Sequence, residues 1–271
     1  MKNIFVNNSI LTIALVSYNN PQDVEKTLSS LLHLQKVNFE ILLVDSSDNR
    51  LIHDLFNKYA QLLKIRYFFQ EPNGVYSAMN LAIDEAETGS YIWFLNPGDA
   101  LYNSLSLQKL LVYLDDSNLN WGFGQAKNEK PQDHLIYPVN VPTLTPESVA
   151  LGQVQISHQA ILVKTQKLIA LGKFNEKYKI ASDLEMVIKL SNFEYYFLDE
   201  ILVSIDLNGL SRKKPIRTII ETNYIVYKLS HRSFLASVYN LFKSLVSLQF
   251  GAMTIQIVRI IKKLGYTKNA K

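Results

Sequence analysis

Two aspartates stand where an apolar run gives way to a polar turn. Asp45 follows the apolar residues 41–44, and Asp99 closes an Asn-Pro-Gly-Asp turn directly after the apolar run 91–95. A carboxylate at the end of a buried strand can accept hydrogen bonds from a nucleobase or a ribose. A carboxylate presented by a tight turn can hold Mg²⁺ or Mn²⁺ together with phosphate oxygens and water. Each residue is also compatible with a helix N-cap or a simple turn aspartate.

Three further side chains could act on protons or phosphates. Asp183 and Glu185 stand in the first turn of a helical pattern that ends at Leu190. Either can serve as a general base if it lies within hydrogen-bond reach of the proton it accepts, although acids are common in a first helical turn because of the helix dipole. His158 is a candidate ligand for a metal or a phosphate, but a lone histidine is more often structural.

Several chemistries are excluded by composition and motif. The 271 residues include no cysteine, which rules out disulfides, thiolate catalysis and cysteine zinc sites. The sequence has no Gly-rich phosphate loop of the P-loop or dinucleotide type and no G-x-S-x-G nucleophile motif. Its tyrosines and basic residues form no recognisable nucleic-acid module, so nucleic acid is not expected as a partner.

The elements that must position these side chains alternate between strand and helix. Apolar, strand-like runs at 10–16, 41–44, 65–69 and 91–95 are separated by residues with helical spacing. Such alternation predicts an α/β fold: a mostly parallel sheet with right-handed crossovers and helices on both faces. Ligands of such sheets bind beyond the carboxyl ends of the strands. We therefore expect a pocket where three polar turns share that edge: 17–20, 45–49 and 96–99.

The second half of the sequence is less regular. Residues 115–155 show no sustained period, and we expect one or two strands and a long loop over the site. Order returns in strands at 159–163, 195–198 and 201–205, in a helix at 184–190 and in a helical pattern beyond Pro215.

The residues from Ser211 onward have a charge opposite to that of the rest. They include twelve Lys/Arg and one acid, a net charge of +11, whereas the whole chain carries +4. We therefore expect a domain at 1–210 and a basic amphipathic helical extension at 211–271. Such an extension can lie on an anionic membrane surface, or it can cap the domain or pair two copies in a homo-oligomer. We find no signal peptide and no run long enough to cross a membrane, so we expect a cytoplasmic protein, peripheral at the inner face of the cytoplasmic membrane.

Six segments, taken in order, carry a family resemblance. In one-letter code they are LTIALVSYN at 11–19, ILLVDSSD at 41–48, EPNGVYSAMN at 71–80, YIWFLNPGD at 91–99, SHQA at 157–160 and FNEKYKIASD at 174–183. Together they resemble the inverting glycosyltransferases of family 2, which have a GT-A fold, and in particular the bacterial enzymes of exopolysaccharide and O-antigen assembly. The resemblance leaves the basic extension outside.

The resemblance implies a role for each candidate. Asp99 would bind the metal, Mg²⁺ or Mn²⁺, His158 would lie near the metal or the diphosphate, and Asp183 would deprotonate the acceptor hydroxyl. The donor would be a nucleotide-sugar, with a UDP-sugar expected, and the acceptor a saccharide or a polyprenyl-linked sugar of a surface polysaccharide. The implied substrate-binding residues are Ser17, Tyr18 and Asp45 around the nucleoside, with Asn73, Asn80, Asn96 and His158.

The sequence departs from the family pattern near the donor. Residues 71–74 are one residue shorter than the usual loop and carry Asn73 in place of its aspartate, and Ser77 stands where relatives have another aspartate. These departures leave open a non-catalytic nucleotide-sugar-binding subunit of a polysaccharide assembly complex. Nucleotidyl transfer is disfavoured, because no Gly-rich basic loop near the N-terminus could hold a triphosphate.

Overall fold

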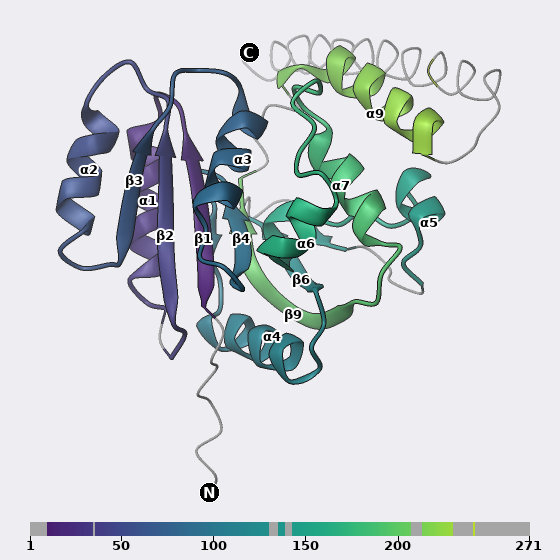
Figure 1. Ribbon diagram of the computed structural model, residues 1–271, viewed down its shortest axis with the longest axis horizontal. Helices are drawn as coiled ribbons and strands as arrows, with labels where there is room; N and C mark the ends of the chain where they lie inside the picture. Colours follow the sequence, from purple (N-terminus) through teal and green to yellow (C-terminus); the bar gives the residue numbers. More distant parts are fainter. Residues whose placement is uncertain are drawn as a thin grey trace, which may run out of the picture. The chain divides into compact units, whose positions relative to one another are not determined.

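The computed structural model of the chain (Figure 1) describes residues 10–34, 36–129, 135–138, 143–206, 213–229 and 241. Its internal contacts divide the chain into two units, Met1–Gly209 and Leu210–Lys271. The first unit contains the sheet and every candidate site residue. The second contributes helix α9 (Pro215–Leu229), and the helical pattern expected after it lies outside the described residues apart from position 241.

The first unit is built on one sheet with the strand order β3-β2-β1-β4-β8-β6-β9-β5, with β7 paired to β6. The pairs from β3 to β4 are all parallel, whereas β8 is antiparallel to β4 and to β6, and β9 is again parallel to β6. The strands are β1 (Leu11–Ser17), β2 (Phe39–Asp45), β3 (Ile65–Phe69), β4 (Tyr91–Leu95), β5 (Ala100–Leu101), β6 (Trp121–Asn128), β7 (Ile136–Tyr137), β8 (Ile161–Lys164) and β9 (Tyr196–Ile205). The expected α/β fold is confirmed, with a parallel N-terminal half and a mixed C-terminal half.

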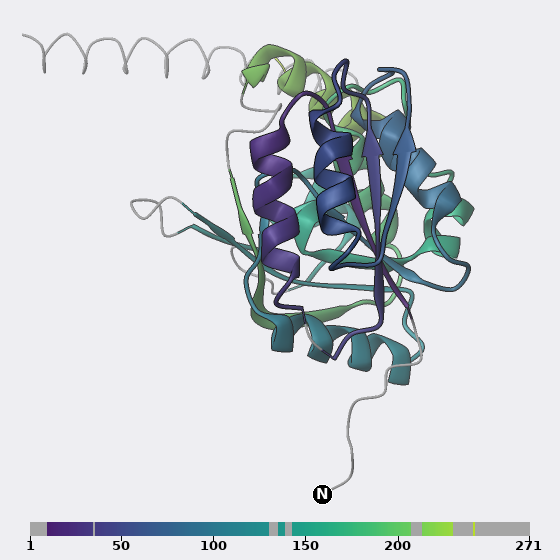
Figure 2. The ribbon, with the colours of Figure 1, turned by 90° about the vertical axis from the view of Figure 1, so that its left-hand side faces the viewer.

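Helices lie on both faces of the parallel half. Figure 2 shows α1 and α2 together on one side of the strands and α3 on the other. The helices of this unit are α1 (Pro21–Leu31), α2 (Leu51–Tyr59), α3 (Val75–Glu85), α4 (Ser104–Asp116), α5 (Pro146–Ala150), α6 (Thr165–Ala170) and α7 (Ser182–Leu190), with the 3₁₀ turn η1 (His158–Ala160) before β8.

One expectation for the second half was wrong. The two strands expected at 195–198 and 201–205 are one continuous strand, β9, and the polar residues between them lie in a register shift between Phe197, opposite Phe123, and Ile201, opposite Gln125. The one or two strands expected within 115–155 are confirmed as β6 and β7, and β6 lies in the interior of the sheet order.

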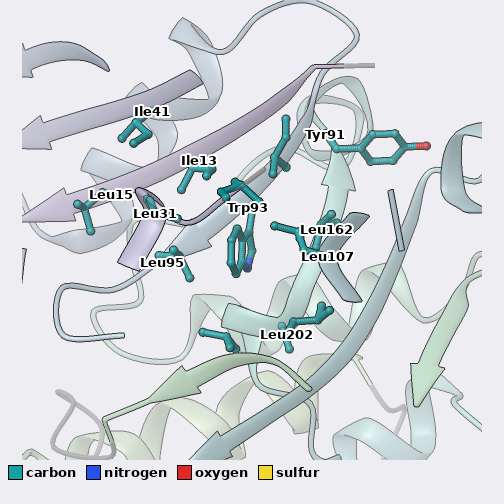
Figure 3. Packing of buried hydrophobic residues seen from close by; sticks show 14 of the residues in the cluster. Ile13, Leu15, Leu31, Ile41, Tyr91, Trp93, Leu95, Leu107, Leu162 and Leu202 are labelled. Atoms are coloured by element: carbon teal, nitrogen blue, oxygen red, sulfur yellow. The ribbon is translucent and has the colours of Figure 1, made fainter. Parts of the chain in front are cut away.

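The hydrophobic core explains why the parallel strands read as unbroken apolar runs. All seven residues of β1 and all five of β4 are buried, because helices cover both faces. Figure 3 shows Trp93 surrounded by aliphatic side chains from several elements, including Leu107 of α4 and Leu202 of β9. The indole Nε1 of Trp93 donates to the carbonyl of Gln159 at 2.6 Å, which fastens η1 to β4.

Two glycines let β6 pass between its neighbours. A Cβ at Gly122 would lie 2.7 Å from the carbonyl oxygen of Tyr196 and 2.9 Å from Leu114 of α4. A Cβ at Gly124 would lie 2.5 Å from Cγ of Leu202. A register shift between β6 and β9 falls at Gly124, and the absence of side chains at both glycines permits the close approach of the two strands.

We predict that Gly124→Ala destabilises the fold by about 1–3 kcal/mol, the usual cost of adding a methyl group to a filled core. Urea unfolding followed by circular dichroism would measure the change. Ser204→Ala, on the neighbouring strand β9, should change the free energy of unfolding by no more than about 0.5 kcal/mol. A Gly124→Ala protein as stable as wild type would contradict the tight packing described for β6.

Candidate active site

The candidate residues meet at the carboxyl edge of the parallel strands. Ser17 at the end of β1 pairs with Asp45 at the end of β2, which pairs in turn with Phe69 of β3. Because β8 runs antiparallel to β4, the turn η1 that precedes β8 lies beside the end of β4. The sheet thereby brings His158 to the same edge as the turn at 96–99.

Asp45 is buried and engaged by neighbouring donors. Its Oδ1 accepts hydrogen bonds from the Ser17 hydroxyl at 3.2 Å, the Ser47 hydroxyl at 2.6 Å and the Ser47 N–H at 2.9 Å. Its Oδ2 accepts from the Tyr67 hydroxyl at 2.9 Å, and burial together with this bond raises the pKa of Tyr67 to about 12. Three of these four donors converge on Oδ1, and one binds Oδ2. Asp45 and Ser17 therefore hold the loop after β2, rather than offering free polar groups to a nucleoside.

The loop that Asp45 holds forms one wall of a pocket of about 450 Å³. Tyr18, from the loop after β1, is 57% exposed, which leaves its ring available to stack on a base. The pocket is lined by Ser46, Ser47, Asp48, Asn49, Arg50, His53, Tyr67, Phe69, Glu71 and Pro72. The lining thus includes two of the donors to Asp45, Ser47 and Tyr67.

The turn at 96–99 is fastened to helix α1. Gly98 has a φ of 96°, in the left-handed region that favours glycine, and its N–H donates to the Thr27 hydroxyl and the Asp23 carbonyl, each at 3.0 Å. The Thr27 hydroxyl donates in turn to the carbonyl of Asp99 at 2.7 Å. Asn96 contributes its backbone, because its carbonyl accepts from the Asp99 N–H at 3.0 Å. The turn is therefore positioned by α1 as well as by β4.

The carboxylate of Asp99 points inward and is 1% exposed. Its Oδ2 accepts from the N–H of Asn96 at 3.1 Å, and its Oδ1 accepts from the N–H of Asp206, just after β9, at 3.0 Å. Burial raises the pKa of Asp99 to about 6, although these two N–H groups, the charge of His158 and the Gln159 side chain act to lower it. A nearby cation would favour the ionised form further.

His158 connects Asp99 and Asp183 electrostatically. Its Nδ1 lies 3.0 Å from Oδ2 of Asp183, and its buried Nε2 has no hydrogen-bond partner among the residues that the structure describes. Burial acts to lower the pKa of His158, but the hydrogen bond to Asp183 and the charges of Asp183 and Asp99 raise it overall. In the neutral ring, an Nδ1–H that donates to Asp183 leaves Nε2 as a free acceptor, which is the state of a metal-binding imidazole.

Asp183 is the better placed of the two acids at the start of α7. Burial acts to raise its pKa, but His158, the Leu184 N–H and the Tyr76 hydroxyl lower it overall, so it is a carboxylate at neutral pH. Glu185 is 3% exposed and pairs with Lys189 on its own helix at 3.5 Å. The structure therefore supports Asp183, and not Glu185, as the candidate base.

Two of the predicted asparagines have structural partners. Asn73 donates to the Ser77 hydroxyl at 3.1 Å, and Gln70 donates to the same oxygen at 2.7 Å, so Ser77 closes the short loop before α3. Asn80 accepts from the N–H of Phe174 and donates to its carbonyl, both at 2.9 Å. The substrate contacts expected of Asn73, Asn80 and Asn96 stay predictions.

The residues present fit a divalent cation bound together with a diphosphate. No group of three or more His, Asp or Glu side chains converges on a metal site within the described part of the chain. Magnesium, however, usually takes one or two protein ligands and completes its shell with phosphate oxygens and water. The buried Asp99 carboxylate and the unpartnered Nε2 of His158 offer such a partial set.

Sequence reasoning did not single out two tyrosines of the site. The Tyr67 hydroxyl binds the carboxylate of Asp45, and the Tyr76 hydroxyl binds that of Asp183. Tyr76 and Asp183 are 107 residues apart. Nothing local in the sequence distinguishes such a tyrosine from one that only fills the core, and the fold alone reveals the contact.

Comparison with known proteins identifies relatives of the chain. The model of the family described as Glycosyl transferase family 2 matches residues 12–138, a range that includes Asp45 and Asp99. The chondroitin synthase of Pasteurella multocida (strain Pm70) is 25% identical over 237 residues, which are 85% of this chain and 24% of that protein. The chain spans less than two thirds of the length of the curated relatives it matches.

Solved structures share the fold. TarS of S. aureus (residues 1–349) aligns with a TM-score of 0.64 and 17% identity, covering 85% of this chain and 68% of that one. The mannosyltransferase PcManGT from Pyrobaculum calidifontis, in complex with GDP-Man and Mn²⁺, aligns with a TM-score of 0.63 and 15% identity, covering 94% of this chain and 80% of that one. These likenesses confirm the expected GT-A fold. The match of the family model over residues 12–138 agrees with the resemblance to glycosyl transferase family 2.

Proposed function

We propose that the chain is an inverting glycosyltransferase that moves a sugar from a nucleotide-sugar to a hydroxyl of a saccharide or lipid-linked acceptor. The observation that carries this proposal is the position of His158. One ring nitrogen contacts Asp183, and the other is buried without a partner in the described part of the chain, close enough to Asp99 for the two charges to interact. A base thus lies beside a partial cation site, as required when a hydroxyl loses its proton while a diphosphate departs.

In the proposed step, the acceptor oxygen bonds to the anomeric carbon of the donor sugar. The bond from that carbon to the diphosphate breaks, and its electron pair leaves with the nucleoside diphosphate. Asp183 receives the proton of the acceptor hydroxyl. Attack from the face opposite the leaving group inverts the anomeric centre. A divalent cation held by Asp99 and His158 would neutralise the charge that develops on the diphosphate.

The donor that we propose is a UDP-sugar. The fold neighbour TarS has been solved in complex with UDP-GlcNAc, whereas PcManGT has been solved with GDP-Man. In the proposed arrangement the nucleoside occupies the pocket beside Asp45, between Tyr18 and the loop after β2, and its diphosphate reaches toward Asp99. A relative that is named a chondroitin synthase supports a saccharide acceptor.

The alternative is a subunit that binds a nucleotide-sugar without turnover. The reason to consider this subunit is that Asn73 and Ser77 stand where relatives have aspartates. The structure closes that loop through Gln70, Asn73 and Ser77, and Asp183 keeps its partners, so the geometry favours the enzyme. Binding of UDP and metal with no turnover on any acceptor would favour the subunit.

We predict that UDP with Mn²⁺ raises the melting temperature of the wild-type protein more than either does alone. A ligand at 100 times its Kd stabilises a folded protein by about 2.7 kcal/mol. Asp99→Asn and His158→Ala should each remove most of the metal-dependent part of the shift. The shift should also be smaller at pH 5 than at pH 7.5, because the pKa of Asp99 is raised to about 6 and its protonated form is a poor ligand. Equal metal-dependent shifts in both variants and wild type would exclude these residues as the cation site.

We predict that Asp183→Asn lowers the rate of sugar transfer by roughly 10²–10⁴-fold, the usual contribution of a general base. Asp84→Asn is the matched control, because Asp84 lies on α3 and pairs with Lys173 on the surface. Donor turnover measured by release of UDP should be unchanged in the control. Wild-type rates in Asp183→Asn would rule Asp183 out as the base.

The basic extension supports a second proposal, that the protein binds an anionic membrane surface peripherally. None of the helices within the described ranges is long and apolar enough to span a bilayer. Along α9, four large apolar or aromatic side chains are exposed at helical spacing, and this helix belongs to the stretch with a net charge of +11. They are Ile216, Ile220, Tyr224 and Tyr227, which are 58%, 50%, 56% and 39% exposed. A helix that lies in the membrane interface needs such an apolar face. Each well-placed Lys or Arg adds about 1 kcal/mol to the free energy of binding to an anionic membrane.

Flotation with vesicles that contain phosphatidylglycerol should recover the full-length protein, whereas vesicles of phosphatidylcholine alone should recover much less. The double variant Ile220→Glu/Tyr224→Glu should float poorly. Leu62→Glu, which changes a residue 63% exposed in the first unit, should float like wild type. Equal soluble fractions with and without anionic vesicles would exclude the membrane surface, and dimerisation lost in the double variant would indicate instead that α9 pairs two copies.

A further inference from the structure

The donors around Asp183 leave one oxygen partly open. Oδ1 accepts from the Leu184 N–H at 2.9 Å and lies 3.0 Å from the Tyr76 hydroxyl, whereas within the described part of the chain Oδ2 has a polar contact with Nδ1 of His158 alone, at 3.0 Å. A carboxylate has about four lone-pair positions, so one position remains, on Oδ2.

Tyr76 is held rigidly by its ring. The side chain is 5% exposed, and the ring stacks on Phe174 with centroids 5.6 Å apart and an interplanar angle of 26°. Phe94 of β4 contacts the Phe174 ring edge-on, with the two ring centroids 5.3 Å apart. The hydroxyl oxygen is therefore fixed by packing, and only its proton can rotate.

The single proton of Tyr76 has two acceptors. The hydroxyl oxygen lies 2.6 Å from the carbonyl of Ile180 and 3.0 Å from Oδ1 of Asp183. When Asp183 is ionised, its charge attracts that proton. When Asp183 has been protonated on Oδ2, the Ile180 carbonyl can take the hydrogen bond with no heavy atom moving.

Helix α3 also holds the segment that carries the base. One turn after Tyr76, the Asn80 amide binds both backbone groups of Phe174 and donates to Glu176 at 2.9 Å. The residues from 174 to 183 are therefore tied to α3 at both ends, by Asn80 and by Tyr76. This arrangement fixes the position of Asp183 relative to the loop that Ser77 closes at the start of the same helix.

Building on the proposed glycosyl transfer, we propose that Tyr76 is a positioning residue that directs the acceptor's proton to Oδ2 of Asp183. By occupying Oδ1, the Tyr76 hydroxyl leaves Oδ2 as the basic oxygen. The O–H bond of the acceptor breaks, its proton binds Oδ2, and its electron pair forms the new bond to the anomeric carbon. Tyr76 itself exchanges no proton with the substrate.

The test is the steady-state kinetics of Tyr76→Phe, which keeps the ring stack and removes only the hydroxyl. We expect kcat to fall about tenfold or more, the effect of losing a hydrogen bond to a charged group, while the KM for the donor and the affinity for UDP with Mn²⁺ stay within twofold of wild type. Tyr91→Phe is the matched control, since its hydroxyl donates to the carbonyl of Leu119 at 2.6 Å, away from the site. The control should lose comparable thermal stability and keep its kcat.

The variant Asn80→Ala distinguishes two effects: loss of the hydrogen bond to Oδ1 of Asp183, and loosening of the segment 174–183 that carries Asp183. This variant frees the segment at Phe174 without removing a group from Asp183, so its kcat should fall less than that of Tyr76→Phe. A kcat for Tyr76→Phe within twofold of wild type, or an effect on donor KM alone, would overturn the proposal. Failure of the proposed function is distinguishable, because the wild-type protein would then release no UDP with any acceptor.

Discussion

The reversal of direction between β4 and β8 is the constraint on which the site depends. Four parallel strands present at this edge only their last residues and the turns that follow, which include Asp45 and Asp99. A strand that enters the sheet from the opposite end presents the residues that precede it, and β8 brings His158 to the edge in this way. The hydrogen bond from Trp93 to Gln159 fixes that approach. Without the reversal, the imidazole and the carboxylate of Asp99 would lie at opposite ends of the sheet.

The edge also concentrates buried carboxylates, each of which needs partners because an unpaired buried charge is costly. The three carboxylates, Asp45, Asp99 and Asp183, have different hydrogen-bond partners. Asp45 is surrounded by donors from its own loop and from β1 and β3. Asp99 is bound mainly by two backbone N–H groups, one of them at the end of β9. Asp183 is bound by side chains from α3 and η1. Burial alone would disfavour all three anions, so the donor sets determine which oxygens remain available to a ligand.

The parallel half of the fold could be predicted from the sequence because burial on both faces makes each strand an uninterrupted apolar run. The positions of Asp45 and Asp99 followed from the same pattern, since a strand's end is local information. The continuity of β9 could not be predicted, because the charged residues in its middle, which lie at the register shift with β6, resemble a turn in the sequence. The tyrosines on Asp45 and Asp183 were missed for a related reason: a hydroxyl that binds a distant carboxylate leaves no trace in the local pattern. The engagement of Asp45 by four donors is likewise a property of the folded loop.

The support of Asp45 has a consequence for how the molecule could change. Its donors come from β1, β3 and the loop after β2, whereas Asp99, His158 and Asp183 are supported by α1, β9, η1 and α3. The proposed nucleoside pocket and the residues proposed for chemistry therefore depend on different elements of the same sheet domain. Under that proposal, exchange of residues 46–53 would change the preferred nucleotide and leave the supports of Asp99 and Asp183 in place. Nucleotide preference would then evolve through one loop and the start of one helix, without change to the catalytic residues.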